Sequence, residues 1–459
     1  MKISLLTIAK NTAYALLIMS PALVNAQSSR DWTNMRGYDQ SGINVFETPK
    51  DTATTFDGLD VRFGAGFTQS FQNLKHENSL NNLYKMSPGF NTANANLFMD
   101  VQLADGIRLN LTSYLSSRHH NETWVKGGFI QFDKLPFKGQ IWEDIMKFTT
   151  IKIGHTEINY GDQHFRRSDG GQTLYNPFVE NYIMDAFSTE IGGEVYVRQG
   201  AAFAMLGVTN GLIKGNIDSV TIGKDPVTGA IDDNLRKSPS IFGKIGFDKQ
   251  VDENLRIRVA GSFYHNSSAG NNGNTLYGGD RTGSNYFMVM EQASTTVNGV
   301  ITPLAGVTYS ANAFSGRYNP GFTKKIDAFQ LNGFVKTYGL EVFGTFEVAK
   351  GRSKTEADSR NAQQIAIEGV YRFGSSENLF VGARYNTVKS DALSGIAANS
   401  IVTNDTKIDR TSFSAGWFLT KNILLKGEYT TQKYKDFAAT DYRNGGKFDG
   451  YVIQAVVGF

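Results

Sequence analysis

The sequence contains no cysteine among its 459 residues and only nine prolines. The absence of cysteine excludes a disulfide framework, so an exported protein of this length must gain its stability in another way. The 48 glycines, 20 tyrosines and 32 phenylalanines favour strands and turns over helices. Basic and acidic residues nearly balance, at 46 and 43, and this balance gives no support to nucleic-acid binding.

Long apolar runs are also missing from the chain after its first 26 residues. The most apolar later stretch is 201–208, which is much shorter than the roughly 20 residues that a helix needs to cross a bilayer. This excludes a helical membrane protein. A slightly hydrophilic average, with a mean hydropathy of −0.30, is still compatible with membrane-spanning strands, because only alternate residues of such strands meet lipid.

The amino terminus has the order of a secretory signal. Lys2 and Lys10 precede an apolar stretch, and small residues end at Ala26. We therefore predict a signal peptide over 1–26 and a mature chain that begins near Gln27. Removal of the two lysines would lower the formal net charge of +3 by two, which leaves the mature chain close to neutral.

The last twelve residues, 448–459, alternate with a period of two. One face is apolar throughout and consists of Tyr451, Ile453, Ala455, Val457 and Phe459. The other face is small or only partly apolar and consists of Gly450, Val452, Gln454, Val456 and Gly458. This pattern predicts a strand with an apolar environment on one side only.

The same alternation recurs along most of the chain. Leu97, Met99 and Val101, for example, alternate with Asp100 and Gln102. We predict sixteen strands, at 59–71, 93–103, 107–115, 123–132, 148–159, 187–198, 201–209, 241–248, 255–265, 326–338, 340–350, 361–373, 379–388, 409–419, 423–433 and 448–459. A hairpin signal at Asn298-Gly299 leaves eighteen strands as the alternative, although poor alternation around it favours a hairpin inside a loop.

The links between these strands alternate between short and long. Short links such as 105–106, 199–200 and 420–422 are followed by long polar stretches such as 160–186 and 266–325. Transmembrane barrels have short turns at the periplasmic end and long external loops, and loops this long are unusual in a compact soluble domain. The fold class is therefore all-β, a closed antiparallel transmembrane β-barrel over 57–459, preceded by a polar periplasmic lead-in over 27–56.

The chain resembles Gram-negative outer-membrane porins, including those of the phosphate- or anion-selective type. The resemblance rests on the signal, the alternating strands and the terminal aromatic residue, with Tyr451, Ile453, Val457 and Phe459 in the place of the assembly signal. It implies an outer-membrane location and contact with outer-membrane lipid, lipopolysaccharide and the barrel-assembly machinery. It also implies passage of small solutes or anions, and a homotrimer is the family's usual assembly, with the monomer left open.

A barrel of about this size leaves an aqueous channel unless loops or a plug fill it. The predicted inward face carries more basic than acidic residues, which indicates a weak preference for anions. A mixed-charge lining without selectivity is the alternative. The predicted lumen-lining arginines are Arg62, Arg108, Arg198, Arg256, Arg258, Arg372, Arg384 and Arg410.

The third long loop, 160–186, is the predicted pore constriction. It clusters charged residues beside glycines and so resembles the loop that folds into the pore of trimeric porins; a charged surface loop is the alternative. The candidate constriction residues are Asp162, His164, Arg166, Arg167 and Asp169.

Catalysis has little support in the sequence. None of the six histidines lies in a recognisable nucleophile motif, and the pair His119-His120 lacks nearby ligands for a metal. We therefore expect no enzyme activity, no metal and no cofactor. Two alternatives remain beside the diffusion channel: a gated transporter of hydrophobic substrates with 27–56 as a small hatch, and a structural or adhesive barrel acting through its loops.

Overall fold

The computed structural model describes residues 32, 34–50, 56–116, 122–211, 237–270, 273–297, 300–304, 315–354, 356, 358–397 and 400–459. The predicted signal peptide and the histidine pair at 119–120 lie outside these residues.

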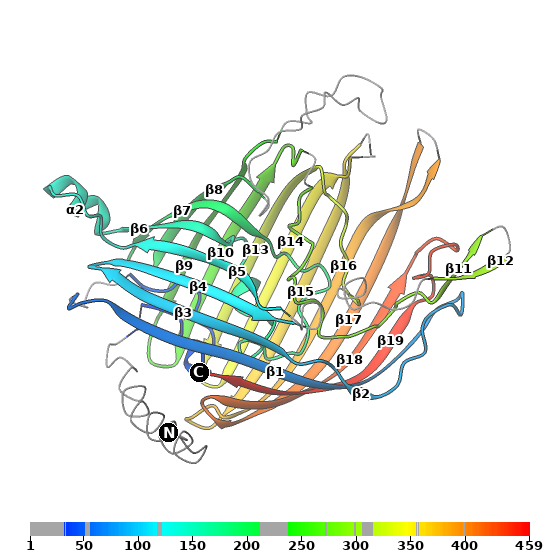
Figure 1. Ribbon diagram of the computed structural model, residues 1–459. Coiled ribbons are helices and arrows are strands. Elements are labelled where there is room, and N and C mark those ends of the chain that lie inside the picture. Colours follow the sequence, from blue (N-terminus) through cyan, green and yellow to red (C-terminus); the bar gives the residue numbers. More distant parts are fainter. Residues whose placement is uncertain are drawn as a thin grey trace, which may run out of the picture.

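The described strands of the barrel wall form one antiparallel sheet that closes on itself (Figure 1). Each strand pairs with the next one along the chain, and β1 pairs with β19 to complete the ring. The wall has sixteen strands, as predicted, with the two-residue β2 added in the link after β1. The wall strands are β1 (Asp60–Glu77), β3 (Asn94–Ala104), β4 (Ile107–Leu115), β5 (Trp124–Phe132), β6 (Thr149–Glu157), β7 (Thr189–Gln199), β8 (Ala202–Thr209), β9 (Ser240–Gln250), β10 (Leu255–Asn266), β13 (Lys325–Thr337), β14 (Leu340–Arg352), β15 (Arg360–Phe373), β16 (Leu379–Ala397), β17 (Ser400–Thr420), β18 (Ile423–Lys435) and β19 (Lys447–Gly458).

The alternation of the sequence maps onto the two faces of this wall. Outward side chains are apolar and exposed, with Phe63 at 71%, Ile245 at 70% and Ile367 at 54%. Inward side chains such as Asp100 and Gln364 are polar and buried. An apolar outer face is stable only against lipid, whereas the polar inner face needs hydrogen-bond partners inside the barrel.

Short links gather at one end of the barrel and long links at the other, here named the short-link end and the long-loop end. At the tight link between β3 and β4, Gly106 has φ +68°, a left-handed conformation that glycine adopts without steric cost. The helix α2 (Gln140–Met146) lies in the one longer link at the short-link end (Figure 1). Within the described ranges, no helix is long and apolar enough to cross a membrane.

Two stretches differ from the predicted loops. The stretch between the predicted strands 379–388 and 409–419 is largely strand, because β16 and β17 continue pairing up to Ala397 and Ser400. Likewise, β1 extends to Glu77 rather than ending at residue 71. The hairpin predicted around residue 298 is present as β11 (Ser294–Val297) and β12 (Val300–Pro303), a separate two-stranded sheet outside the wall, so the alternative of eighteen strands is wrong.

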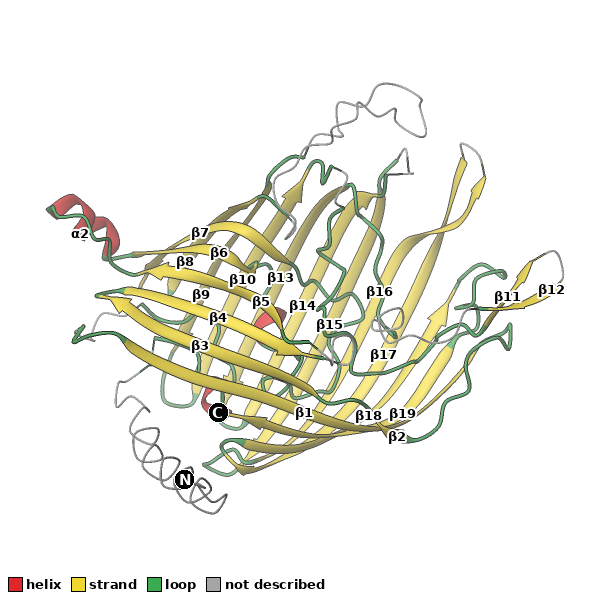
Figure 2. Cartoon of the chain, viewed as in Figure 1, coloured by secondary structure: helices red, strands yellow, loops and turns green. Residues whose placement is uncertain are grey.

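The remaining regular elements are two short 3-10 helices, η1 (Gln40–Gly42) and η2 (Gln163–Phe165). Figure 2 shows that strands account for most of the regular structure and that loops run through the interior of the barrel. The loops bring apolar side chains with them: Phe46 and Tyr182 pack with Phe334 and Phe343 of the wall in one buried cluster. The interior is therefore partly filled by the chain itself.

Candidate functional site

The third loop, residues 158–188 between β6 and β7, folds into the barrel. All of its residues are buried except His164, Phe165 and Asp169, which are half-buried. Polypeptide placed inside a barrel must find partners for its backbone and charged groups. The charged residues predicted for this loop supply many of these contacts.

Asp162 binds two basic residues of the wall. Its carboxylate accepts hydrogen bonds from Arg258 Nε and Nη2, both at 2.8 Å, and from Lys244 Nζ at 2.9 Å. Its backbone amide donates to Asn332 Oδ1 at 2.8 Å. Burial alone would raise the pKa of Asp162, but Lys244 and Arg258 outweigh it and hold the pKa well below its usual range. The beginning of the loop is thus tied to β9, β10 and β13.

Arg166 extends the loop toward a more distant part of the wall. Its guanidinium lies 3.5 Å from Glu341 on β14 and 3.5 Å from Glu368 on β15. It also donates to the side-chain oxygen of Asn44. The guanidinium lies near the rings of Phe334 and Phe343, 5.4 and 5.2 Å from their centroids.

Arg167 and Asp169 contact a different group of residues. Arg167 Nη2 donates to Asp185 Oδ2 at 2.5 Å, within the same loop, and Nη1 lies 3.7 Å from Asp280. Asp169 forms an ion pair with Lys126 of β5, which also donates to Asp280 at 2.7 Å. These residues therefore join the third loop to the loop around Asp280.

His164 is the remaining predicted loop residue. Its Nε2 lies 2.8 Å from Asn159 Oδ1, and its Nδ1 lies 3.3 Å from Glu157. Burial lowers the pKa of His164 despite the nearby carboxylate.

The second half of the loop is held by β16 and β18. Lys426 Nζ donates to the carbonyl oxygens of Thr173, Asn176 and Phe178 at 2.7, 2.8 and 2.9 Å. Arg384 Nη1 donates to the Glu180 carbonyl at 2.7 Å. The loop therefore crosses the lumen and is attached to the wall at both ends.

The amino-terminal segment 34–50 also lies within the barrel. Asn44 Nδ2 donates to Glu341 at 2.5 Å, and Glu47 forms ion pairs with Arg258 at 2.8 Å and Lys244 at 3.4 Å. Burial would raise the pKa of Glu47, but these two cations lower it to about 2. The described part of the predicted lead-in thus contributes to the lumen.

The eight predicted lumen arginines all lie on the inner face, but few are uncompensated. Four are paired with wall carboxylates: Arg62 with Asp100, Arg108 with Asp133, Arg256 with Asp248 and Arg372 with Glu341. Two pair with a carboxylate and also contact a loop: Arg258 with Asp162 and Arg384 with Glu368. Arg410 donates to the carbonyls of Asn181 and Gly316, and Arg198 to the carbonyl of Glu47.

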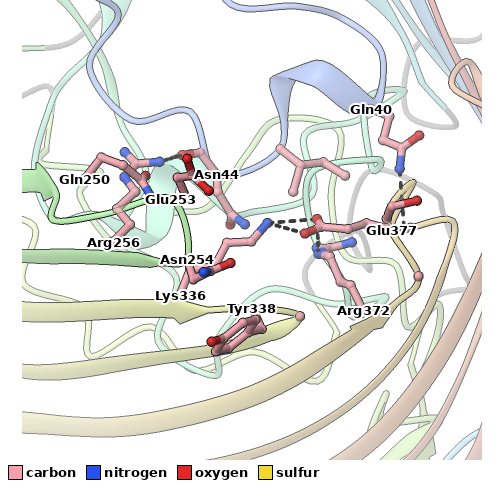
Figure 3. A pocket seen from close by; sticks show the side chains of 14 residues that line it. Gln40, Asn44, Gln250, Glu253, Asn254, Arg256, Lys336, Tyr338, Arg372 and Glu377 are labelled. Carbon is pink, nitrogen blue, oxygen red and sulfur yellow. Dashed lines mark hydrogen bonds and ion pairs between the residues drawn. The ribbon is translucent and has the colours of Figure 1, made fainter.

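Cavities remain beside the packed loop and segment. At the short-link end, a cavity of about 650 Å³ opens between the links after β9, β13 and β15 (Figure 3). Lys336, Arg372 and Glu377 point toward one another there, with Lys336 Nζ 2.8 Å from Glu377 Oε2. Gln40 of η1 also lines this cavity and donates to the Ser376 carbonyl at 3.1 Å.

Two further cavities lie inside the wall of β3 to β7. The larger, about 260 Å³, is lined by Arg36, Arg62, Lys152 and several aromatic rings. The smaller, about 100 Å³, is lined by Lys50, Lys152 and Arg198 and lies toward the short-link end. Lys152 lines both cavities.

Four cations on this side lack a carboxylate partner. Lys152 lies near the rings of Phe129 and Tyr196, 5.1 and 5.0 Å from their centroids. Arg36, Lys50 and Arg198 donate only to backbone carbonyls. Among the described residues, none of these four side chains forms an ion pair within 4.0 Å.

The first prediction placed the segment 34–50 in a periplasmic lead-in, with a hatch as the alternative, so its charged residues Glu47 and Lys50 were not among the predicted lumen residues. The segment has no period of two or 3.6 that would have placed it. Its signal was Met35, Ile43, Val45 and Phe46, apolar residues in a mostly polar stretch, which favour burial. Within the described ranges, no group of three or more His, Cys, Asp or Glu side chains is arranged to hold a metal ion.

No protein-family model and no curated protein sequence matches the chain. Among solved structures, it is similar to the anion-selective porin from Comamonas acidovorans, with 10% identity over 88% of this chain and 100% of that chain and a TM-score of 0.51. The fold is that of an outer-membrane porin-like β-barrel.

Two other porin-like barrels match at lower TM-scores. An OmpT loop-deletion mutant from Vibrio cholerae has 11% identity over 88% of this chain and 100% of that chain, with a TM-score of 0.47. The channel DcaP of Acinetobacter baumannii has 9% identity over 89% of this chain and 99% of that chain, with a TM-score of 0.47.

Proposed function

We propose that the chain is an outer-membrane channel for the passive diffusion of small hydrophilic solutes, with a weak preference for anions. In this proposal the long-loop end faces outside and the short-link end faces the periplasm. The observation that carries it is the third loop, which crosses the lumen and leaves cavities along β3 to β7. A loop in this position narrows a pore and sets the size of what passes.

The residues that would form the constriction are those that fix the loop and line the remaining space. Asp162 and Arg166 attach the loop to β10, β14 and β15. His164, Phe165 and Asp169 are its half-buried residues, and all three line the 260 Å³ cavity. These contacts give the predicted loop residues a role in shaping the pore rather than in binding a particular solute.

The anion preference rests on the four unpaired cations, Arg36, Lys50, Lys152 and Arg198. Most other basic groups of the lumen are neutralised by carboxylates within 4.0 Å, so they contribute little net field. Glu157 and Glu194 also line the larger cavity and reduce the positive potential. The expected selectivity is therefore modest.

Planar-bilayer recording of the purified protein tests this function. A steady open-channel current with a reversal potential shifted toward that of chloride in a KCl gradient is the expected result. The absence of channel current at every voltage would overturn the proposal. Replacing Lys152 with Glu should shift the reversal potential toward that of potassium, whereas the exposed outer-wall residue Lys249, changed to Glu, supplies a matched control with no expected effect.

A gated channel is the second candidate, favoured by the position of the segment 34–50 inside the barrel. Gln40, Asn44 and Glu47 tie this segment to the wall and the third loop. If the segment acts as a hatch, replacing Gln40 and Asn44 with Ala should increase open probability or conductance. Unchanged currents in that variant would leave the segment as a fixed part of the pore wall.

The proposal has three further parts. They are export by a cleaved signal peptide over 1–26, domain boundaries at 27 and 57, and assembly as a homotrimer. The expected mature mass begins near Gln27, and mass spectrometry of protein taken from the outer membrane measures it. Cross-linking in native membranes distinguishes a trimer from a monomer.

A further inference from the structure

A segment of the link between β10 and β13, residues 284–292, lies inside the long-loop end of the barrel and is called the cap segment below. Tyr286 of this segment is fully buried, and its ring packs edge-on against Phe448 of β19 with 5.6 Å between ring centroids. The Gln72 side chain of β1 donates to the Phe287 carbonyl at 2.8 Å and accepts from the Phe287 amide at 3.0 Å. The cap segment therefore lies against the inner face of β1 and β19.

The third loop holds the other side of the cap segment. Glu180 of that loop accepts hydrogen bonds from the Ser284 hydroxyl at 2.7 Å, from the Tyr286 amide at 3.2 Å and from the Asn285 amide. Arg317, which follows the cap segment in the same link, donates twice to Glu180, at 3.0 and 2.8 Å. The cap segment thus fills the lumen between the third loop and the wall.

Two methionines of the cap segment have an unfavourable backbone conformation. Met288 has φ +67° and Met290 has φ +58°, in the left-handed region that residues with a side chain rarely adopt. Such a conformation costs free energy and persists only where the surrounding contacts hold it. The loss of one of these contacts therefore favours a change in the position of the segment.

His76, near the end of β1, makes one of these contacts. Its Nδ1 accepts a hydrogen bond from the Met290 amide at 2.9 Å, and its Nε2 lies 2.5 Å from the Tyr84 carbonyl oxygen in the link after β1. Because a carbonyl oxygen can only accept and an amide N–H can only donate, this imidazole is neutral and carries its hydrogen on Nε2. Protonation of Nδ1 would place an N–H opposite the Met290 N–H and break that hydrogen bond.

The contact of His76 lies beside a short pairing of the two links. Leu83 and Gln292 form an antiparallel bridge, and the Tyr84 amide donates to the Glu291 carbonyl at 3.0 Å. This pairing joins the cap segment to the link after β1. His76 therefore acts at the junction through which the cap segment is attached to the long-loop end of the wall.

A positive charge on His76 would have no compensating partner, because none of the described carboxylates forms an ion pair with it. Most charged groups around it are already paired, since Lys447 pairs with Glu77 and Asp449, and Arg443 with Asp441. The titratable and charged groups on the adjoining parts of β1, β19 and the links after β1, β10 and β18 are Lys75, Glu77, Tyr84, Lys85, Glu291, Asp441, Tyr442, Arg443, Lys447 and Asp449.

Glu291 is the group of the cap segment that titrates near neutral pH. Burial raises the pKa of Glu291 to about 7, so acid neutralises it. A neutral carboxyl group is easier to bury than a charged one. Protonation of Glu291 therefore favours the buried position of the cap segment, and a release of the segment in acid has to come from His76.

We propose that His76 is an acid-sensitive latch, which holds the cap segment inside the barrel at neutral pH and releases it at about pH 5–6. A cavity of about 110 Å³ lies between Ser284, Asn285 and Phe287 and the link after β1, so the cap segment has room to shift. The release itself does not depend on what the chain transports. A wider open channel in acid is a consequence that rests on the proposed function.

Hydrogen exchange of the full-length protein in detergent, followed by mass spectrometry, tests the release. The cap segment is compared at about pH 7.5 and about pH 5, with each rate corrected for the intrinsic pH dependence of exchange. The expected result is at least about fivefold faster exchange of the cap segment in acid, while the wall strand β14 stays equally protected. Equal protection of the cap segment at both pH values would overturn the proposal.

Two substitutions separate the charge of His76 from its shape. His76→Gln keeps a donor and an acceptor but does not titrate, so the effect of acid should disappear. His76→Lys is charged at both pH values and offers no acceptor to Met290, so exchange should be fast at both. The matched control is His265→Gln, because His265 is an exposed histidine at the long-loop end of β10 that pairs with Asp327. This control should respond to acid like the parent protein, and a full acid effect in His76→Gln would overturn the proposal.

The absence of cysteine from the chain allows a further test that leaves His76 unchanged. Leu83→Cys combined with Gln292→Cys places the only two thiols at the antiparallel bridge, where the Cα atoms lie within reach of a disulfide. The oxidised variant should keep slow exchange in acid, and its reduction should restore the release. Fast exchange of the oxidised variant in acid would contradict the proposal, because the cap segment would then leave without opening this junction.

Gel migration shows whether each variant has formed its wall, since folded barrels migrate faster than heat-denatured ones. In planar bilayers, the conductance of the parent protein should rise in acid and that of His76→Gln should not. The absence of channel current at both pH values would count against the proposed function, whereas hydrogen exchange would still decide whether His76 releases the cap segment.

Discussion

Asp162 in the third loop accepts two hydrogen bonds of 2.8 Å from Arg258 on β10. Lys244 of β9 adds a third at 2.9 Å. Together with Glu47, this loop carboxylate therefore compensates two buried cations of the wall. Because removing one member of a buried ion pair leaves an uncompensated charge, its loss typically costs about 3–5 kcal/mol.

Replacing Asp162 with Asn should therefore destabilise the protein and release the start of the third loop. We expect a lower midpoint of urea unfolding in detergent, with a loss of about 3 kcal/mol or more, and a larger or noisier single-channel conductance. The exposed Asp105, which pairs with Lys134 at the short-link end, supplies the control Asp105→Asn. Parental conductance in the Asp162 variant would show that this contact does not hold the constriction.

Arg166 and Arg167 offer a test of the loop farther from its start. Changing both to Ala leaves Glu341 and Glu368 without one of their cations, so the lumen becomes more negative and anion permeability should fall. The same change should raise conductance, because two large side chains leave the interior. The control is Arg443→Ala, because Arg443 lies in an external loop and pairs with Asp441. Unchanged conductance and selectivity in the double variant would show that the third loop does not form the constriction.

Lys50 should make the proposed channel sensitive to pH. Burial, and then the nearby charges of Arg108 and Lys134, lower the pKa of Lys50 to about 8. A lysine with a lowered pKa is charged below that value and neutral above it, so the anion preference should decline as the pH rises from 7 to 9. Reversal potentials across this range measure the effect. Lys50→Arg keeps its charge and should remove this part of the pH dependence; an equally steep decline in the Arg variant would assign the titration to another group.

The terminal residue closes the ring. Phe459 N donates to Ala65 O at 3.0 Å, and Ala65 N donates to Phe459 O at 2.8 Å, while the Phe459 side chain is 59% exposed on the outside. Phe459→Ala should keep both backbone hydrogen bonds but weaken recognition by the assembly machinery. Purified Phe459→Ala should fold into detergent micelles like the parent protein, yet reach the outer membrane in smaller amounts. Equal amounts in the membrane would remove Phe459 from the assembly signal.

The wall could be predicted from the sequence because lipid and lumen impose opposite polarities on alternate residues. That signal disappears where a strand leaves the membrane. Beyond Tyr385, the outward residues Thr387, Lys389 and Asp391 are as polar as the inward ones, so the continuation of β16 was indistinguishable from a loop. The loop residues Asp162 and Arg166 could be recognised as a charged cluster, but their partners could not, since Arg258 and Glu368 are far away in the chain.

The path of the segment 34–50 could not be predicted either. Its contacts, such as Asn44 with Glu341 and Glu47 with Arg258, join residues about 200 or more positions apart and follow no local period. The sequence predicts an excess of basic residues on the inner face. Because the folded chain pairs most of them with carboxylates, the positive potential in the lumen is smaller than this excess indicates. Only the structure shows which cations remain uncompensated.

Lys426 has a consequence for how the pore can change its width. Its single ammonium group holds three carbonyl oxygens within six residues of the third loop, so that part of the loop cannot swing aside as a door without breaking all three bonds together. Any rapid opening or closing of the proposed pore would then have to come from another part of the interior.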